Sequence, residues 1–126
     1  MPNSHRLVLT LSCVFCWTLL GAFAAHAQTV TATLGVGTRP QSVAVNPVTN
    51  KIYVANVGGK NVTVIDGATN FTTTVNAGTQ PSSIGVNPVT NKIYVANAIS
   101  NNVTVIEGAS NNTVNVTTGS SLFQSL

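Results

Sequence analysis

Short apolar runs of four or five residues alternate with polar turn segments along most of this chain. The runs are rich in valine, isoleucine and threonine. Runs that are this short and this rich in β-branched residues favour strands over helices. The first set of four runs predicts strands at residues 42–45, 51–55, 62–65 and 71–75.

The second and third runs carry apolar residues at consecutive positions, such as Ile52, Tyr53 and Val54. This pattern suits a strand that is covered on both faces. It favours a four-stranded blade between two neighbouring blades over a two-sheet sandwich, whose strands more often alternate apolar and polar residues. We therefore expect Tyr53 and its repeat Tyr94 to pack in a core rather than to stack on sugars.

Turn chemistry separates the runs. In Asn46-Pro47 the asparagine can accept backbone hydrogen bonds, and the proline sets φ for a β-turn and stops a central strand. Asp66-Gly67 starts the next reversal in the same way, and its repeat is Glu107-Gly108. We expect a turn-forming role for both carboxylates, in preference to the acid–base pair of a glycosidase.

An internal repeat organises the chain. Residues 46–56 return letter for letter as residues 87–97, an offset of 41 residues. A period of this length is typical of repeat architectures. The sequence divides into a unit at residues 38–78 and a second unit at 79–119, and residues 30–36 match the fourth strand of a unit.

Two words of the repeat resemble a known family. Tyr-Val-Ala-Asn at residues 53–56 and 94–97 is followed by Val-Thr-Val-Ile-Asp-Gly at 62–67 and Val-Thr-Val-Ile-Glu-Gly at 103–108. These words resemble the YVTN-type β-propeller repeat, with alanine in place of the usual third-letter threonine. The resemblance implies an all-β fold of two four-stranded antiparallel β-propeller blades, a partial propeller. It also implies an extracytoplasmic protein of the bacterial or archaeal surface or periplasm, in a family whose members mostly bind or scaffold.

The N-terminal segment has the form of a secretory signal peptide. A polar start with Arg6 precedes an apolar run at residues 7–24, and Ala25-His26-Ala27 provides a small-x-small site. We expect residues 1–27 to be removed between Ala27 and Gln28, which leaves a secreted, periplasmic or cell-surface protein without a membrane span. The alternative is an uncleaved anchor, since about 18 apolar residues are at the threshold for crossing a bilayer.

Two units are too few for a closed ring, which needs at least about 160 residues at four blades. The pattern stops after Gly119, and residues 120–126 form a tail that we interpret as a truncated repeat. The chain is then either a fragment of a longer propeller or one of several copies that close a ring as a homo-oligomer. We favour the fragment, because a terminal repeat is expected to be an adapted cap.

Composition excludes several functions. Only 6% of the residues are charged, and the cations after residue 27 make no basic stripe, so we expect no nucleic-acid partner. Residues 28–126 contain no histidine or cysteine, which removes Ser-His-Asp and Cys-His catalysis and a structural zinc site. We therefore expect no enzyme activity of its own, no catalytic residue, no cofactor and no metal.

The connections that enter the first strand of a blade and join its second and third strands emerge on one side. Because binding residues are usually carried by loops on a rigid scaffold, this side is the candidate ligand face. Its candidate residues are Arg39, Asn56, Lys60, Gln80, Asn97 and Asn101.

The sequence thus predicts an extracytoplasmic binding or scaffold module whose partner is a protein or glycan at the cell envelope. Two alternatives stay open. One is a fragment of a propeller enzyme of the amine-dehydrogenase kind, with its catalytic residues in other blades. The other is a lectin-like chain of two blades that closes a ring by homo-oligomerisation.

Overall fold

The computed structural model describes residues 28–119. The expected signal peptide at 1–27, which includes Ala27, lies outside the described residues. The tail at 120–126 lies outside them as well. The chain divides into two units, Met1–Thr33 and Leu34–Leu126. Residues 28–33 of the first unit contain no helix or strand, and the second unit carries all the strands described. Nowhere between residues 28 and 119 is there a helix with the length and apolar character to span a membrane.

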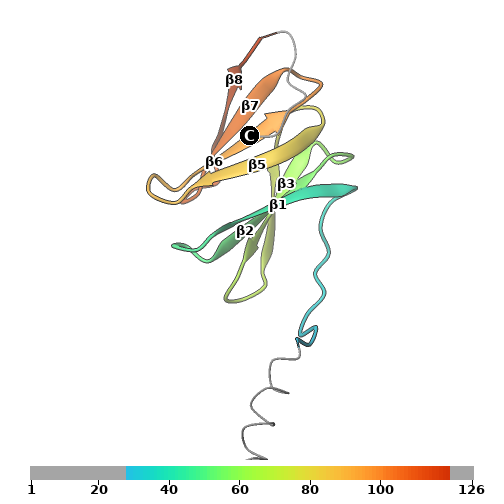
Figure 1. Ribbon diagram of the computed structural model, residues 1–126, viewed down its shortest axis with the longest axis vertical. Coiled ribbons are helices and arrows are strands. Elements are labelled where there is room, and N and C mark those ends of the chain that lie inside the picture. The colour runs from blue at the N-terminus through green and yellow to red at the C-terminus, as the bar shows by residue number, and fades with distance from the viewer. Residues whose placement is uncertain (1–27, 120–126) are drawn as a thin grey trace, which may run out of the picture. The chain divides into compact units, whose positions relative to one another are not determined.

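Eight strands follow one another in the second unit (Figure 1). They are β1 (Pro40–Asn46), β2 (Lys51–Asn56), β3 (Asn61–Asp66), β4 (Thr72–Asn76), β5 (Pro81–Asn87), β6 (Lys92–Asn97), β7 (Asn102–Glu107) and β8 (Thr113–Thr117). They form two antiparallel sheets in the orders β1-β2-β3-β4 and β5-β6-β7-β8, which we call blade 1 and blade 2. The predicted all-β class with two four-stranded antiparallel blades is confirmed.

Strand register sorts the apolar side chains of each blade onto two faces. In blade 1, Tyr53 lies opposite Val64, whereas Val54 lies opposite Val43 on the other face. We call the face that carries Tyr53 the tyrosine face, and the opposite face, which carries Ile52 and Val54, the isoleucine face. The tyrosine face holds Tyr53, Ala55, Val62, Val64 and Val75 in blade 1, and Tyr94, Ala96, Val103, Val105, Val114 and Val116 in blade 2. The isoleucine face holds Val43, Val45, Ile52, Val54 and Ile65 in blade 1, and Ile84, Val86, Ile93, Val95 and Ile106 in blade 2.

The hydrophobic core lies between the two blades. It is a single cluster in which the tyrosine face of blade 1 packs against the isoleucine face of blade 2. Its buried members are Tyr53, Val62, Val64, Val75, Ile93, Val95 and Ile106. Full burial of one such aliphatic side chain contributes about 1.5–3 kcal/mol to folding. This packing explains the consecutive apolar positions of the sequence, since each blade has an apolar surface on both faces.

Two polar contacts also join the blades. The side-chain amide of Asn46 donates to Oδ1 of Asn91 at 3.0 Å. The Lys51 ammonium donates to the carbonyl oxygen of Gly108 at 2.7 Å. Both contacts lie at the end of the blades where β1 turns into β2, so they fix the angle between the blades from outside the apolar cluster.

The turns have the predicted chemistry. Oδ1 of Asn46 accepts the backbone N–H of Val48 at 3.1 Å, which closes the turn after β1. Oδ1 of Asp66 accepts the N–H groups of Ala68 and Thr69, both at 2.9 Å. Asparagine or aspartate at the first position of a turn stabilises it by this local hydrogen bond.

The expected strand at residues 30–36 is wrong for this chain, because these residues form no strand. A segment that matches a fourth strand needs a blade with only three strands of its own. Both blades already have their fourth strand, β4 and β8, and no third strand is left without a partner among the described residues. In the second unit of the repeat, the fourth strand is β8.

Candidate functional site

The candidate loops of blade 1 lie against each other. The backbone N–H of Val57 in the β2–β3 loop donates to the Arg39 carbonyl at 3.0 Å, and that of Gly58 donates to the Thr38 carbonyl at 3.1 Å. The segment that enters β1 and the β2–β3 loop are therefore joined into one surface at this end of the blade.

Blade 2 repeats the arrangement. The N–H of Ala98 donates to the Gln80 carbonyl at 3.0 Å, and that of Ile99 donates to the Thr79 carbonyl at 3.2 Å. Because the two blades have the same contacts at the repeat offset, all four connections lie at one end of the two blades. We call it the loop end.

Four of the six candidate residues have left-handed backbones. The φ angles are 54° at Arg39, 54° at Lys60, 61° at Gln80 and 50° at Asn101. A side chain in this region costs about 1–2 kcal/mol, so surrounding contacts must hold it there. The carbonyls of Lys60 and Asn101 accept the N–H groups of Ala77 and Thr118, which follow β4 and β8, at 3.0 and 3.2 Å, and thereby supply such contacts.

The side chains of these four residues differ in exposure. Arg39 and Lys60 in blade 1 are exposed, whereas Gln80 and Asn101, at the equivalent positions in blade 2, are half-buried. The loop end therefore presents two cationic groups and two amides from a fixed backbone.

Asn56 and Asn97 do not face solvent, and their prediction as surface contacts is wrong. Both are fully buried. The Asn56 amide donates to Oδ1 of Asn61 at 2.8 Å and to Oγ1 of Thr63 at 2.9 Å. As the last residue of β2, Asn56 points onto the isoleucine face, where it holds the start of β3 beneath the loop.

The same cluster recurs in blade 2, where Asn97 donates to Asn102 and Thr104, both at 2.8 Å. Sequence reasoning missed this cluster, although its three residues repeat at the same offset. Oδ1 of Asn97, like that of Asn56, is buried and has no hydrogen-bond partner within residues 28–119. These asparagines lie beneath the loops and hold the starts of β3 and β7 by their hydrogen bonds.

A glycine before each blade closes over this cluster. The N–H of Gly37 donates to Oγ1 of Thr63 at 3.3 Å. A Cβ at Gly37 would lie 2.7 Å from side-chain atoms of Asn56, so no larger residue fits without movement. This glycine recurs as Gly78 at the same offset, and the recurrence is a signal in the sequence for this close approach.

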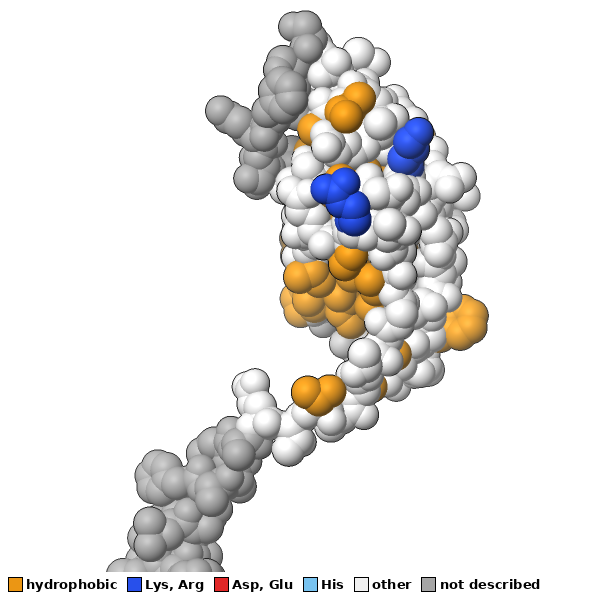
Figure 2. Space-filling model, turned by 90° about the vertical axis from the view of Figure 1, so that its right-hand side faces the viewer, with side chains coloured by type: hydrophobic (Ala, Val, Ile, Leu, Met, Phe, Trp, Pro, Cys, Tyr) orange, Lys and Arg blue, Asp and Glu red, His pale blue; other side chains and the backbone are white. Residues whose placement is uncertain are grey.

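Charge is divided between the two ends of the blades. Arg39 and Lys60 belong to the loop end, whereas Asp66 and Glu107 end β3 and β7 at the opposite end, beside Lys51 and Lys92. Figure 2 shows one face of the molecule, where Lys and Arg side chains stand apart beside a group of hydrophobic side chains, with no acidic side chain in view among the residues drawn in colour. Within residues 28–119, the loop end is therefore cationic.

The two carboxylates have separate structural roles. Asp66 closes its turn, and hydrogen bonds from the backbone N–H groups of Thr69 and Ala68 lower its pKa. Glu107 instead forms an ion pair with Lys92, with Oε1 and Nζ 3.2 Å apart. The turn-forming role is confirmed for Asp66. Glu107 has a side chain one methylene longer, and its carboxylate pairs with the cation.

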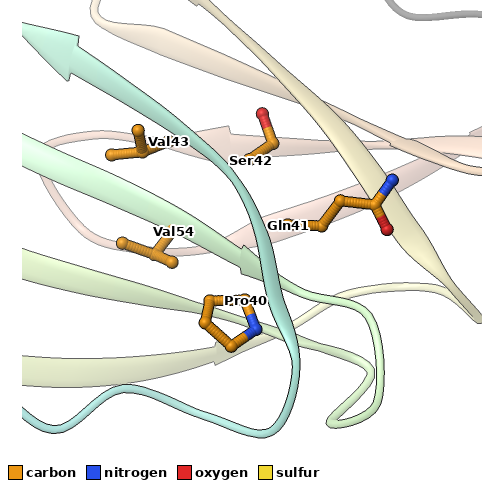
Figure 3. A pocket seen from close by; sticks show the side chains of 5 residues that line it. All are labelled: Pro40, Gln41, Ser42, Val43 and Val54. Carbon is orange, nitrogen blue, oxygen red and sulfur yellow. The ribbon is translucent and has the colours of Figure 1, made fainter.

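A shallow hollow lies on the isoleucine face of blade 1, where β1 starts next to the loop end. It has a volume of about 200 Å³ and is lined by Pro40, Gln41, Ser42, Val43 and Val54. Figure 3 shows Val43 and Val54 beside each other on adjacent strands. Ligand pockets usually have about 300–1,000 Å³, so this hollow is too small to serve as one alone. No group of three or more His, Cys, Asp or Glu that could hold a metal occurs in the described part of the chain.

Comparison with known proteins identifies the fold of this chain. No family model matches the chain, and no curated protein matches it. Among solved structures, hydrazine synthase of Kuenenia stuttgartiensis is similar with a TM-score of 0.62 and 23% identity, over 75% of this chain and 28% of that chain. Apo AztD from Citrobacter koseri is similar with a TM-score of 0.59 and 21% identity, over 70% of this chain and 26% of that chain.

The β-propeller domain of Cps50 (Swd1) from Myceliophteria thermophila is similar with a TM-score of 0.61 and 14% identity, over 73% of this chain and 29% of that chain. Together with the two four-stranded antiparallel sheets, these likenesses identify the fold as that of a β-propeller. The chain spans less than a third of each of these three structures. Its two blades therefore correspond to part of a propeller.

Proposed function

We propose that this chain is a binding or scaffold module of an extracytoplasmic β-propeller of the YVTN type. Its loop end would bind a protein or glycan at the cell envelope. The observation that carries the proposal is the loop end itself, where four connections are hydrogen-bonded into one surface with left-handed residues at fixed positions. Binding residues are usually carried by such loops on a rigid scaffold.

The charges indicate what the partner offers. Arg39 and Lys60 are exposed at the loop end, while Asp66 and Glu107 lie at the other end of the blades. A cationic surface of this kind attracts partners that carry carboxylate, sulfate or phosphate groups. Gln80 and Asn101 add amide donors and acceptors, which suit hydroxyl groups or peptide bonds.

Binding is tested with the labelled chain on an array of carboxylated and sulfated glycans and of acidic peptides. The expected result is binding that the double variant Arg39→Ala/Lys60→Ala loses. Phe71→Ala is the control, because Phe71 is 71% exposed at the opposite end of the blades. No binding to either class, or equal binding by the double variant, would contradict the proposal.

The extracytoplasmic location is tested separately. The full chain with a C-terminal tag is expressed in a bacterial host and recovered from the periplasm or medium, and mass spectrometry determines its N-terminus. We expect Gln28 as the first residue. Ala27→Arg is the control, because the peptidase requires a small residue before the cut. An intact chain that stays in the cytoplasm would contradict this location.

A further inference from the structure

Within residues 28–119, each blade has one face that the other blade covers and one open face, and the open faces repeat most of the apolar residues of the covered ones. Val75 and Val116 occupy equivalent positions on the tyrosine faces of blades 1 and 2. Val75 is 6% exposed because blade 2 covers it, whereas Val116 is 50% exposed. Tyr53 is fully buried, and its counterpart Tyr94 is only half-buried. The difference lies in the neighbour and not in the residues.

The isoleucine faces show the same contrast. Ile93 and Val95 in blade 2 are fully buried against blade 1, whereas Ile52 and Val54 in blade 1 are half-buried. Val43 next to them is 64% exposed, and it lines the hollow in Figure 3. The hollow is thus part of an apolar face that has no second blade on it.

The residues that make the polar contacts between the blades also recur. Their second donors are in blade 2 and their second acceptors are in blade 1. Across the interface, Asn46 donates to Asn91 and Lys51 donates to the Gly108 carbonyl. The equivalent donors in blade 2 are Asn87 and Lys92, next to its open face. The equivalent acceptors in blade 1 are Asn50 and the carbonyl of Gly67, next to the other open face.

We propose that the tyrosine face of blade 2 binds the isoleucine face of blade 1 in a second copy of this chain. The joint reproduces the interface between the two blades, with Asn87 on Asn50 and Lys92 on the Gly67 carbonyl of the second copy. A second copy is the occupant chosen because the chain already displays both halves of this interface, one on each side.

Such an interface is heterologous, so it continues from copy to copy until the ring closes. Propellers have about four to eight blades, which corresponds to two, three or four copies of a two-blade chain. The inference concerns the blade faces and does not depend on a ligand at the loop end. If it fails, the proposed binding function is unaffected.

The test is the solution mass of the tagged, purified chain, measured by light scattering from micromolar to millimolar concentration. A single species of two, three or four copies is expected. A monomer at every concentration would overturn the inference, as would an aggregate of mixed sizes. The first of these outcomes would point instead to further blades of a longer chain as the occupant.

Two variants decide whether the copies associate head to tail. Val116→Asp places a charge on the open tyrosine face, and Val43→Asp places one on the open isoleucine face. Each variant alone is expected to be monomeric, because every joint needs both faces. A mixture of the two is expected to give a one-to-one dimer and nothing larger, since each variant keeps the face that the other has lost.

Val89→Asp is the matched control and should assemble like the unchanged chain. Val89 is 92% exposed. Its counterpart Val48 in blade 1 is still 74% exposed, although blade 2 covers the tyrosine face of blade 1. An oligomer that survives both face variants, or a mixture that remains monomeric, would overturn the inference. Circular dichroism first shows that each variant is folded.

Lys92→Ala tests the proposed polar contact without a charge on the apolar faces. Loss of one hydrogen bond from a charged donor should raise the dissociation constant about tenfold or more. An unchanged constant would remove Lys92 from the joint. If the dissociation constant is unchanged in Lys92→Ala and both face variants still form the oligomer, no contact is left to support the joint.

Discussion

Lys51 and Gly108 are joined across the two blades by a hydrogen bond of 2.7 Å between the lysine ammonium and the glycine carbonyl. The two residues are 57 positions apart in the sequence. Lys51 starts β2, and Gly108 follows β7, so the contact ties the end of one blade to the end of the next. In blade 2, the equivalent Lys92 has no following blade among the described residues and pairs with Glu107 of its own blade.

The first prediction concerns this bond. Lys51→Met keeps most of the aliphatic stem but removes the ammonium, and it should lower the free energy of unfolding by about 1–2 kcal/mol. Urea denaturation measures the change. Lys60→Met is the control, because Lys60 is exposed and its side chain makes no contact between the blades, so a change within about 0.5 kcal/mol is expected. Equal effects of the two substitutions would contradict the role of the bond.

Tyr53 gives a second prediction, of increased stability. Its hydroxyl is buried in the core between the blades and has no hydrogen-bond partner within residues 28–119. A buried polar group without a partner is destabilising, so Tyr53→Phe should raise the free energy of unfolding by about 1 kcal/mol. Tyr94→Phe, half-buried on the open tyrosine face, should have a smaller effect. A loss of stability in Tyr53→Phe would show that the hydroxyl has a partner after all.

The same hydroxyl predicts a dependence on alkaline pH. Burial raises the pKa of Tyr53 above its ordinary value of 10.0. The unfolded chain therefore loses this proton first, and stability that is present below pH 10 is lost as the pH rises towards the higher folded value. The difference in unfolding free energy between Tyr53→Phe and the unchanged chain should widen above about pH 10. A constant difference would contradict this linkage.

Much of the fold could be predicted from the sequence because its signals are local. Asn46-Pro47 and Asp66-Gly67 mark turns through the conformations of those residues alone. The consecutive apolar positions around Tyr53 indicated a strand covered on both faces, and the exact repeat located the second blade. The strand at 30–36 failed because its formation depends on a partner strand, and no local pattern reports whether that partner is present.

The site was less predictable, for a physical reason. Asn56 and Asn97 stand where a strand ends and a loop begins, and a strand alternates its side chains between two faces. A shift of one residue in the register of β2 would therefore have placed Asn56 on the tyrosine face instead. Contacts between blades, such as that of Asn46 with Asn91, depend on how distant segments meet and have no signal in the sequence near either residue.

Asp66 provides a prediction at acid pH. Hydrogen bonds from the backbone of Thr69 and Ala68 lower the pKa of its carboxyl below the ordinary value of 3.8. The contribution to stability is present above about pH 4 and is lost as the pH falls through the lowered folded value. Asp66→Asn keeps an oxygen acceptor for the turn but cannot titrate, so its stability should fall less steeply in acid. Thermal unfolding between neutral and strongly acid pH measures this, and parallel curves for the two proteins would count against it.

The close approach of Gly67 to Asn50 gives the last prediction. The Gly67 N–H donates to the Asn50 carbonyl at 2.7 Å, and a Cβ at this glycine would lie only 2.6 Å from that carbonyl oxygen. Because the obstacle is backbone, the two turns of blade 1 must move apart, and Gly67→Ala should cost about 1–3 kcal/mol of stability. Gly35→Ala is the matched control, since no atom lies within 4 Å of its added Cβ, and it should leave stability unchanged. Urea denaturation of both variants checks the contrast. Equal midpoints would contradict the prediction, because they would show that the turns after β1 and β3 yield to the added methyl group. The Gly67 carbonyl, the proposed acceptor for Lys92 of a second copy, would then have no fixed position.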